Sequence, residues 1–195
     1  MRGPTPRRGP LAAVLSVAVA FSWWTAPFAN AAKRDEAAPL VLLVRHAEKA
    51  SEEGDDPNLT ADGAQRAKDL AAALRDAGVT AIITTQLRRT TETAQPLAAA
   101  LGIKPEIVPL DWQKLPANIK AVAAAVRRHA GGAVLVVGHQ NTVPEIIEAL
   151  GGPHLANICD PVYDNLFVLV PGPSGPRLIR SRYGAASPDP GPGCK

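Results

Sequence analysis

The chain has 195 residues, enough for one α/β domain and a short leader. It has 21 basic and 18 acidic residues, but three arginines and no acids lie in residues 1–31. Without that segment 18 basic and 18 acidic residues remain, and they form no stripe of one sign. This distribution excludes a nucleic-acid-binding footprint, so any recognition of an anion must be local.

The first 31 residues have the pattern of a signal peptide. Arg7 and Arg8 precede the apolar run from Leu11 to Trp24, and Ala29-Asn30-Ala31 forms a small-x-small cleavage site. The run is shorter than the roughly 20 residues that a membrane-spanning helix needs. We therefore expect residues 1–31 to be removed and the protein to be exported to the periplasm or the medium, without a stable membrane anchor.

The first predicted strand carries two functional candidates at its end. Residues 40–44 are all apolar, which is typical of a strand buried on both faces of a parallel sheet. Arg45 and His46 follow directly. Because ligands of open α/β sheets bind at the carboxyl ends of the strands, this guanidinium and imidazole indicate an anionic partner such as phosphate.

Strands and helices alternate through the middle of the chain. Thr60 is an expected helix N-cap, residues 79–85 form a second strand that leads to Arg88 and Arg89, and Gly102 ends the next helix. Residues 104–110 form a weaker third strand, which Asp111 follows.

The last third of the chain supplies a second strongly apolar strand. Residues 133–137 run into Gly138 and His139, and Thr142 and Glu145 are expected to form a capping box for another helix. Residues 166–170 and 178–182 are two strands with a short connection, so they should be antiparallel. From residue 184 to residue 195 the Pro/Gly-rich tail is expected to be disordered.

These elements predict a three-layer α/β/α sandwich with a central, mostly parallel sheet and an antiparallel edge, formed by residues 32–183. The two most apolar strands should lie centrally and next to each other. Their terminal residues Arg45, His46 and His139, together with Arg89, should then converge on one crevice.

The same residues carry a resemblance to the histidine phosphatase superfamily, also called phosphoglycerate mutase-like. Four motifs occur in the family's order. Arg45-His46-Ala47-Glu48 matches R-H-G/A-E, and Leu59-Thr60-x-x-Gly63 matches L-T-x-x-G. Leu87-x-Arg89-Thr90-x-Glu92-Thr93-Ala94 resembles L-x-R-A-x-Q-T-A, and Val137-Gly138-His139 matches V-x-H. The resemblance implies a small, uninserted member that hydrolyses phosphomonoesters or phosphohistidine. It implies His46 as the nucleophile that becomes phosphorylated, with Arg45, Arg89 and His139 binding the phosphoryl oxygens.

The proton donor for the leaving group is the open point. One branch of the family has an Asp directly after the second histidine, where this chain has Gln140. Asp111 is the weak candidate for the general acid because it is the nearest acid after the third strand, and Glu48 is the other acid near the site. Phosphohistidine needs no such acid, so the substrate is a small-molecule or peptide phosphate of either type.

Other functional classes fit the sequence less well. No cofactor is expected, and Arg45 beside His46 would repel a metal cation. A non-catalytic phosphate-binding module or an interaction domain on the same fold has no need of His46, and a phosphoglycerate-mutase-type phosphotransferase would need insertions to enclose its substrate. Cys159 and Cys194 either form a disulfide that ties down the tail or remain unrelated thiols.

Overall fold

The computed structural model describes residues 1, 3, 38–51, 54–191 and 194. The predicted signal peptide at residues 1–31 therefore lies almost wholly outside the described residues. The elements are β1 (Leu40–Arg45), α1 (Ala61–Leu74), β2 (Val79–Thr84), α2 (Arg88–Leu101), β3 (Glu106–Ile107), the 3₁₀ turn η1 (Trp112–Lys114), α3 (Leu115–Arg127), β4 (Ala133–Gly138), α4 (Thr142–Ala149), β5 (Asn165–Val170) and β6 (Arg177–Arg182). In this described part, no helix combines the length and apolar character needed to cross a membrane.

The strands form one six-stranded sheet in the order β3-β2-β4-β1-β5-β6. β1 pairs in parallel with β4, and β4 in parallel with β2, whereas β5 runs antiparallel to β1 and β6 antiparallel to β5. The expected antiparallel edge is thus confirmed. β1 and β4 are central neighbours, as the continuous apolar composition of both strands predicted.

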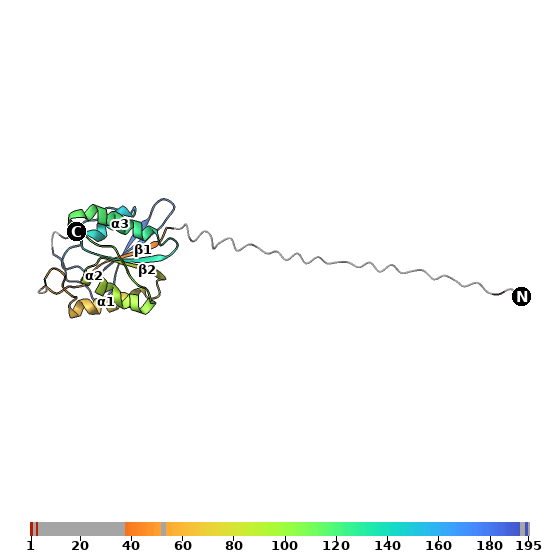
Figure 1. Ribbon diagram of the computed structural model, residues 1–195, viewed down its shortest axis with the longest axis horizontal. Coiled ribbons are helices and arrows are strands. Elements are labelled where there is room, and N and C mark those ends of the chain that lie inside the picture. Colours follow the sequence, from red (N-terminus) through yellow and green to blue (C-terminus); the bar gives the residue numbers. More distant parts are fainter. Residues whose placement is uncertain (2, 4–37, 52–53, 192–193, 195) are drawn as a thin grey trace.

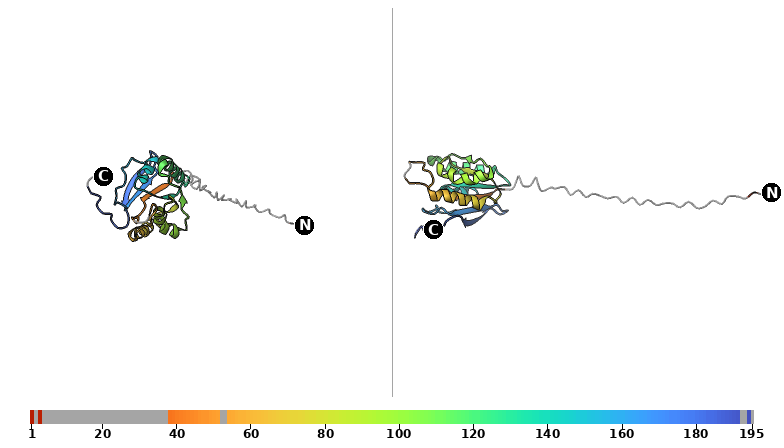
Figure 2. Two further views of the ribbon diagram at one scale, coloured as in Figure 1. Left: turned by 60° about the vertical axis from the view of Figure 1, so that its left-hand side comes forward. Right: turned by 90° about the horizontal axis from the view of Figure 1, so that it is seen from below.

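Helices cover both faces of the sheet, which gives the predicted three layers (Figures 1 and 2). On one face, Leu42 of β1 packs in a cluster with Leu70 of α1 and Leu97 of α2. On the other face, Leu43 packs in a cluster with Val126 of α3 and Ile147 of α4. Successive residues of β1 therefore pack into the cores on opposite faces of the sheet, because side chains alternate along a strand.

The third strand is shorter than the sequence predicts. Only Glu106 and Ile107 pair with β2, rather than the whole of residues 104–110. Pro105 and Pro109 bracket this pair and lack the N–H groups that a longer ladder would use.

Residues 185–187 of the C-terminal segment make hydrogen bonds with the rest of the domain. Within the described part of this segment, the Ala185 carbonyl accepts a hydrogen bond from Arg66 Nη1 (2.8 Å), and Ser187 Oγ accepts from the backbone N–H groups of Tyr163 (2.8 Å) and Asp164 (3.1 Å). These polar contacts attach the described start of the segment to α1 and to the loop before β5.

Candidate active site

The two predicted histidines lie side by side at the carboxyl ends of neighbouring strands. β1 and β4 pair with Arg45 opposite Gly138, so the residues that follow, His46 and His139, leave the sheet together. Their ring centroids are 5.3 Å apart, and both side chains are buried. The two histidines therefore converge at one edge of the sheet, as their positions after the two apolar strands predict.

His46 is held as a neutral imidazole by a hydrogen bond from one of its ring nitrogens. Its Nδ1 lies 2.8 Å from the Ala47 carbonyl oxygen, and because a carbonyl only accepts, Nδ1 carries the proton. The lone pair is therefore on Nε2. Burial, together with the positive charges of Arg45, Arg89 and Lys49, lowers the pKa of His46 to about 3. The side chain lines the pocket described below.

His139 is neutral for the same main reason. Burial lowers its pKa to about 2, and His46, Arg89 and Arg45 add to the effect. Its Nε2 lies 3.4 Å from Thr85 Oγ1, and its backbone N–H donates to Thr142 Oγ1 at 2.8 Å. The expected capping box is thus wrong: the Thr142 hydroxyl fixes the backbone of His139, and Glu145 is exposed.

Arg45 is fixed by the loop that precedes β5. Its Nη1 donates to the carbonyls of Cys159 (3.3 Å) and Val162 (3.2 Å), its Nη2 pairs with Asp160, and its guanidinium lies 4.1 Å from the centre of the Tyr163 ring. Its buried Nε has no partner among the described residues. The guanidinium is therefore positioned before any ligand arrives.

Arg89 lies in the first turn of α2 and is buried, unlike its neighbour Arg88. The Arg89 side chain is 10% exposed against 54% for Arg88. Its Nη1 lies 3.7 Å from Asp56 Oδ1, and its buried Nε is unpaired among the described residues. Arg89 thus supplies buried positive charge with donor capacity to spare, which the L-x-R spacing predicted.

These side chains line one pocket of about 390 Å³. Its lining residues are Arg45, His46, Lys49, Arg89, Trp112, His139, Gln140, Asn141, Asn157 and Asp160. The lining includes three cationic side chains, two neutral imidazoles and a single carboxylate. This excess of positive charge suits a phosphoryl group that several donors bind at once. In the described part of the chain, His, Cys, Asp and Glu side chains form no group of three that could hold a metal ion.

The two acids that the sequence suggested do not line this pocket. Asp111 Oδ1 accepts from the Gln113 N–H at 2.9 Å, which caps η1, and Oδ2 lies 3.5 Å from Lys114 Nζ. Both carboxylate oxygens of Glu48 accept from Arg66 Nε, at 2.8 and 2.9 Å. The structure therefore does not bring Asp111 or Glu48 together with the histidines.

Sequence reasoning missed Trp112, Tyr163 and Asp160. Trp112 begins the short 3₁₀ turn η1, and Asp160 and Tyr163 lie on the loop before β5. No periodic pattern marks a residue of such segments as facing a site. The acid at Asp160 and the aromatic residue at Tyr163 were visible in the sequence, but only the fold shows that their loop returns to Arg45.

The remaining motif residues support the backbone around the site. Thr93 Oγ1 accepts from the Ala47 N–H (2.9 Å), and Glu92 Oε2 accepts from the Leu59 N–H (2.8 Å). Thr60 Oγ1 caps α1 through the Gly63 N–H (3.0 Å), as predicted. The motifs thus couple α1 and α2 to the segment that carries His46.

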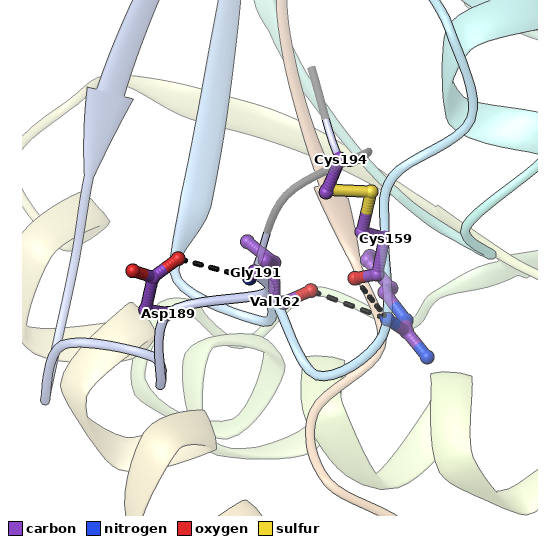
Figure 3. The surroundings of a disulfide bond; sticks show 6 residues. Cys159, Val162, Asp189, Gly191 and Cys194 are labelled. Carbon is purple, nitrogen blue, oxygen red and sulfur yellow. Dashed lines mark hydrogen bonds between the residues drawn. A yellow bond between two sulfur atoms is a disulfide. The ribbon is translucent and has the colours of Figure 1, made fainter.

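Cys159 and Cys194 form a disulfide, the first of the two alternatives that the sequence left open. Figure 3 shows the bond next to the loop that contains Val162. Because the Cys159 carbonyl accepts from Arg45, the bond links the C-terminal segment to the wall of the pocket.

Comparison with known proteins agrees with this geometry. The model of the histidine phosphatase superfamily (branch 1) matches residues 41–110. A search of curated proteins gave no match. The chain is similar in structure to the protein histidine phosphatase SixA, solved with tungstate (16% identity, 76% of this chain and 96% of that chain, TM-score 0.56).

Two further solved structures are similar to the chain. They are Bacillus stearothermophilus YhfR (21% identity, 73% and 96% of the two chains, TM-score 0.55) and the mycobacterial glucosyl-3-phosphoglycerate phosphatase, solved with inorganic phosphate (16%, 76% and 98%, TM-score 0.53). The chain therefore has the fold of the histidine phosphatases. This confirms the resemblance that its motifs predicted.

Proposed function

We propose that this chain is an exported phosphatase that hydrolyses phosphomonoesters or phosphohistidine through a phosphohistidine intermediate on His46. The observation that carries the proposal is the state of His46: a buried neutral imidazole whose Nδ1 is bound to the Ala47 carbonyl, in a pocket with Arg45, Arg89 and His139. The fold and the family resemblance support the same reaction.

The first step is attack of His46 Nε2 on phosphorus. Arg45 and Arg89 bind equatorial oxygens and stabilise the charge that spreads over them in the transition state. His139 donates a further hydrogen bond to the phosphoryl group. The bound dianionic phosphate favours protonation of the His139 imidazole because it offsets the charge of the nearby cations. Water then hydrolyses the phosphohistidine and releases inorganic phosphate.

A phosphate-binding module on the same fold is the alternative from another class. Such a module would need Arg45 and Arg89, but it would not need an imidazole with its lone pair on Nε2. A mutase-type phosphotransferase would use the same intermediate and return the phosphoryl group to a second substrate rather than to water.

Brief reaction with ³²P-labelled p-nitrophenyl phosphate tests the nucleophile. An acid-labile, base-stable label should appear on His46, and His46→Ala should lose both label and turnover while remaining folded by circular dichroism. His154→Ala, which changes a histidine with an 81% exposed side chain, is the control. Full activity in folded His46→Ala would contradict the mechanism, and release of all label to an added alcohol instead of water would identify a phosphotransferase.

Export rests on the sequence pattern of residues 1–31. Mass spectrometry of the protein recovered outside the cytoplasm should find an N-terminus at Ala32. Recovery of the intact chain beginning at Met1 from that fraction would contradict cleavage.

A further inference from the structure

Trp112 is an aromatic side chain that the fold leaves half exposed at the pocket. Its exposed fraction is 52%, and it lines the pocket with the amide side chains of Gln140, Asn141 and Asn157. Its ring meets the His139 ring at 62° with the centroids 5.3 Å apart. An open aromatic face therefore lies next to the phosphoryl site, where the rest of a substrate would extend.

The described carboxylates around the pocket are all engaged in other interactions. Glu48 is ion-paired with Arg66, and Asp160 is ion-paired with the buried Arg45. Asp111 caps η1 and lies near Lys114, and Asp56 accepts from the Arg88 N–H and lies 3.7 Å from Arg89. Each of these carboxylates is therefore committed to a cationic partner. A leaving group that needs protonation would therefore find no donor among these residues.

We propose that the substrate is a phosphate carried by a flat aromatic or heteroaromatic leaving group, and that Trp112 stacks against this ring. The inference rests on the proposed role of His46. A weakly basic phenolate, or a heteroaromatic nitrogen whose ring already carries a proton, can depart without protonation by the enzyme. An aromatic ring also gains from offset or edge-on contact with Trp112 that an alkyl group would not gain.

The chemistry balances without an acid. Nε2 of His46 forms a bond to phosphorus while the bond from phosphorus to the phenol oxygen or ring nitrogen breaks, and its electron pair leaves with that atom. The leaving atom takes any proton it needs from solvent. Water then adds its oxygen to phosphorus, the N–P bond pair returns to Nε2, and both protons of the water depart with the phosphate.

Three probes separate ring recognition from leaving ability. p-Nitrophenyl phosphate has an aromatic and stable leaving group, acetyl phosphate a stable but non-aromatic one, and glycerol 3-phosphate an alkyl one. We expect kcat/KM to be highest for the first and lowest for the last. Trp112→Ala should lower the ratio of kcat/KM for p-nitrophenyl phosphate over acetyl phosphate on the order of 2- to 10-fold, mainly through KM, and Trp112→Phe should restore most of it.

The matched control is Ile107→Ala, which truncates another exposed apolar side chain (53%) on the edge strand β3. It should leave the ratio unchanged. Equal losses on both substrates in Trp112→Ala would overturn the stacking role. A selective loss on glycerol 3-phosphate in Asp160→Asn or Asp111→Asn would reveal a general acid and overturn the substrate class.

Phosphotyrosine and phosphohistidine distinguish the two sources of an aromatic leaving group. Faster turnover of the first assigns an oxygen ester, and faster turnover of the second assigns a ring nitrogen. If neither is hydrolysed faster than glycerol 3-phosphate, the inference is wrong. If His46 is labelled by p-nitrophenyl phosphate in that case, the proposed phosphatase still stands; if no probe labels His46, the proposed function fails as well.

Discussion

Gly63, in the first turn of α1, lies directly against the carbonyl oxygen of Glu48. A Cβ at position 63 would approach that oxygen to 2.2 Å, which no side chain can do without displacing backbone. The same carbonyl accepts from the Thr60 N–H at 2.9 Å. The start of α1 is therefore seated on the backbone two residues after His46.

Gly63→Ala should reduce both stability and activity, because the added methyl must push α1 away from the segment that carries His46. We expect a loss of about 1–3 kcal/mol in the free energy of unfolding, the usual range for overpacking, measured by urea denaturation. Ala64→Ser is the control, since it adds one atom at the exposed neighbouring position of the same turn. Identical unfolding curves for the two variants would show that the contact is not tight in solution.

Arg89→Ala should cost far more activity than Arg88→Ala. Arg89 is buried at the pocket, whereas Arg88 is exposed and pairs with Glu92 at 3.5 Å. Removing a donor to the developing phosphoryl charge should lower kcat on the order of 10²- to 10³-fold, as measured with p-nitrophenyl phosphate. Comparable losses in the two variants would mean that the start of α2 is misassigned.

The buried histidines should make stability depend on pH. In the unfolded chain both imidazoles take up protons below about pH 6.5, whereas burial lowers the pKa of His46 to about 3 and that of His139 to about 2 in the folded protein. The unfolded state thus binds more protons in this interval. Stability from these groups is complete above about pH 6.5 and falls toward about pH 3 by up to about 1.4 kcal/mol per pH unit for each histidine.

Urea denaturation at a series of pH values checks this dependence. The double variant His46→Asn/His139→Asn should lose less stability on acidification than the parent, since asparagine takes up no proton. His154→Asn, at an exposed position, should follow the parent curve. Parallel curves for the parent and the double variant would contradict burial of neutral imidazoles.

Removal of the disulfide should weaken the fold and the site together. Cys159 and Cys194 are 35 positions apart, and closure of such a loop contributes about 3–4 kcal/mol in the chain-entropy account. Cys159→Ala/Cys194→Ala should therefore unfold at lower urea and turn over p-nitrophenyl phosphate more slowly. Dithiothreitol should lower the stability and the turnover of the parent but leave those of the double variant unchanged. If the turnover of the parent does not respond to the reductant, the disulfide does not support the pocket.

The sequence could predict the site where chemistry coincides with regular structure. His46, Arg45 and His139 follow strands whose apolar runs identify them as central, and parallel neighbours must end at the same edge. Arg89 could be placed because the start of a helix after a strand lies at that edge too. The central pairing of β1 with β4 followed from their apolar composition, and the antiparallel edge followed from a short connection.

Residues on loops could not be predicted in the same way. Asp160 reaches Arg45 only because the loop before β5 folds back over β1, and nothing in the local sequence encodes that path. The position of Asp111 after a predicted strand suggests an acid at the pocket, but β3 ends early and the side chain caps η1. Side-chain direction in irregular segments depends on distant contacts, which periodicity does not report.

The central place of β1 in the sheet governs when the pocket can form during synthesis. β1 pairs with β4, which begins at Ala133, and with β5, which ends at Val170. β1 therefore cannot complete its pairing until both later strands have been synthesised. Pairings between such distant segments form slowly because a long loop must close first. Chains halted on the ribosome before residue 170 should therefore show no phosphatase activity, and the proposed exported protein would acquire a working pocket only after most of its length had been made.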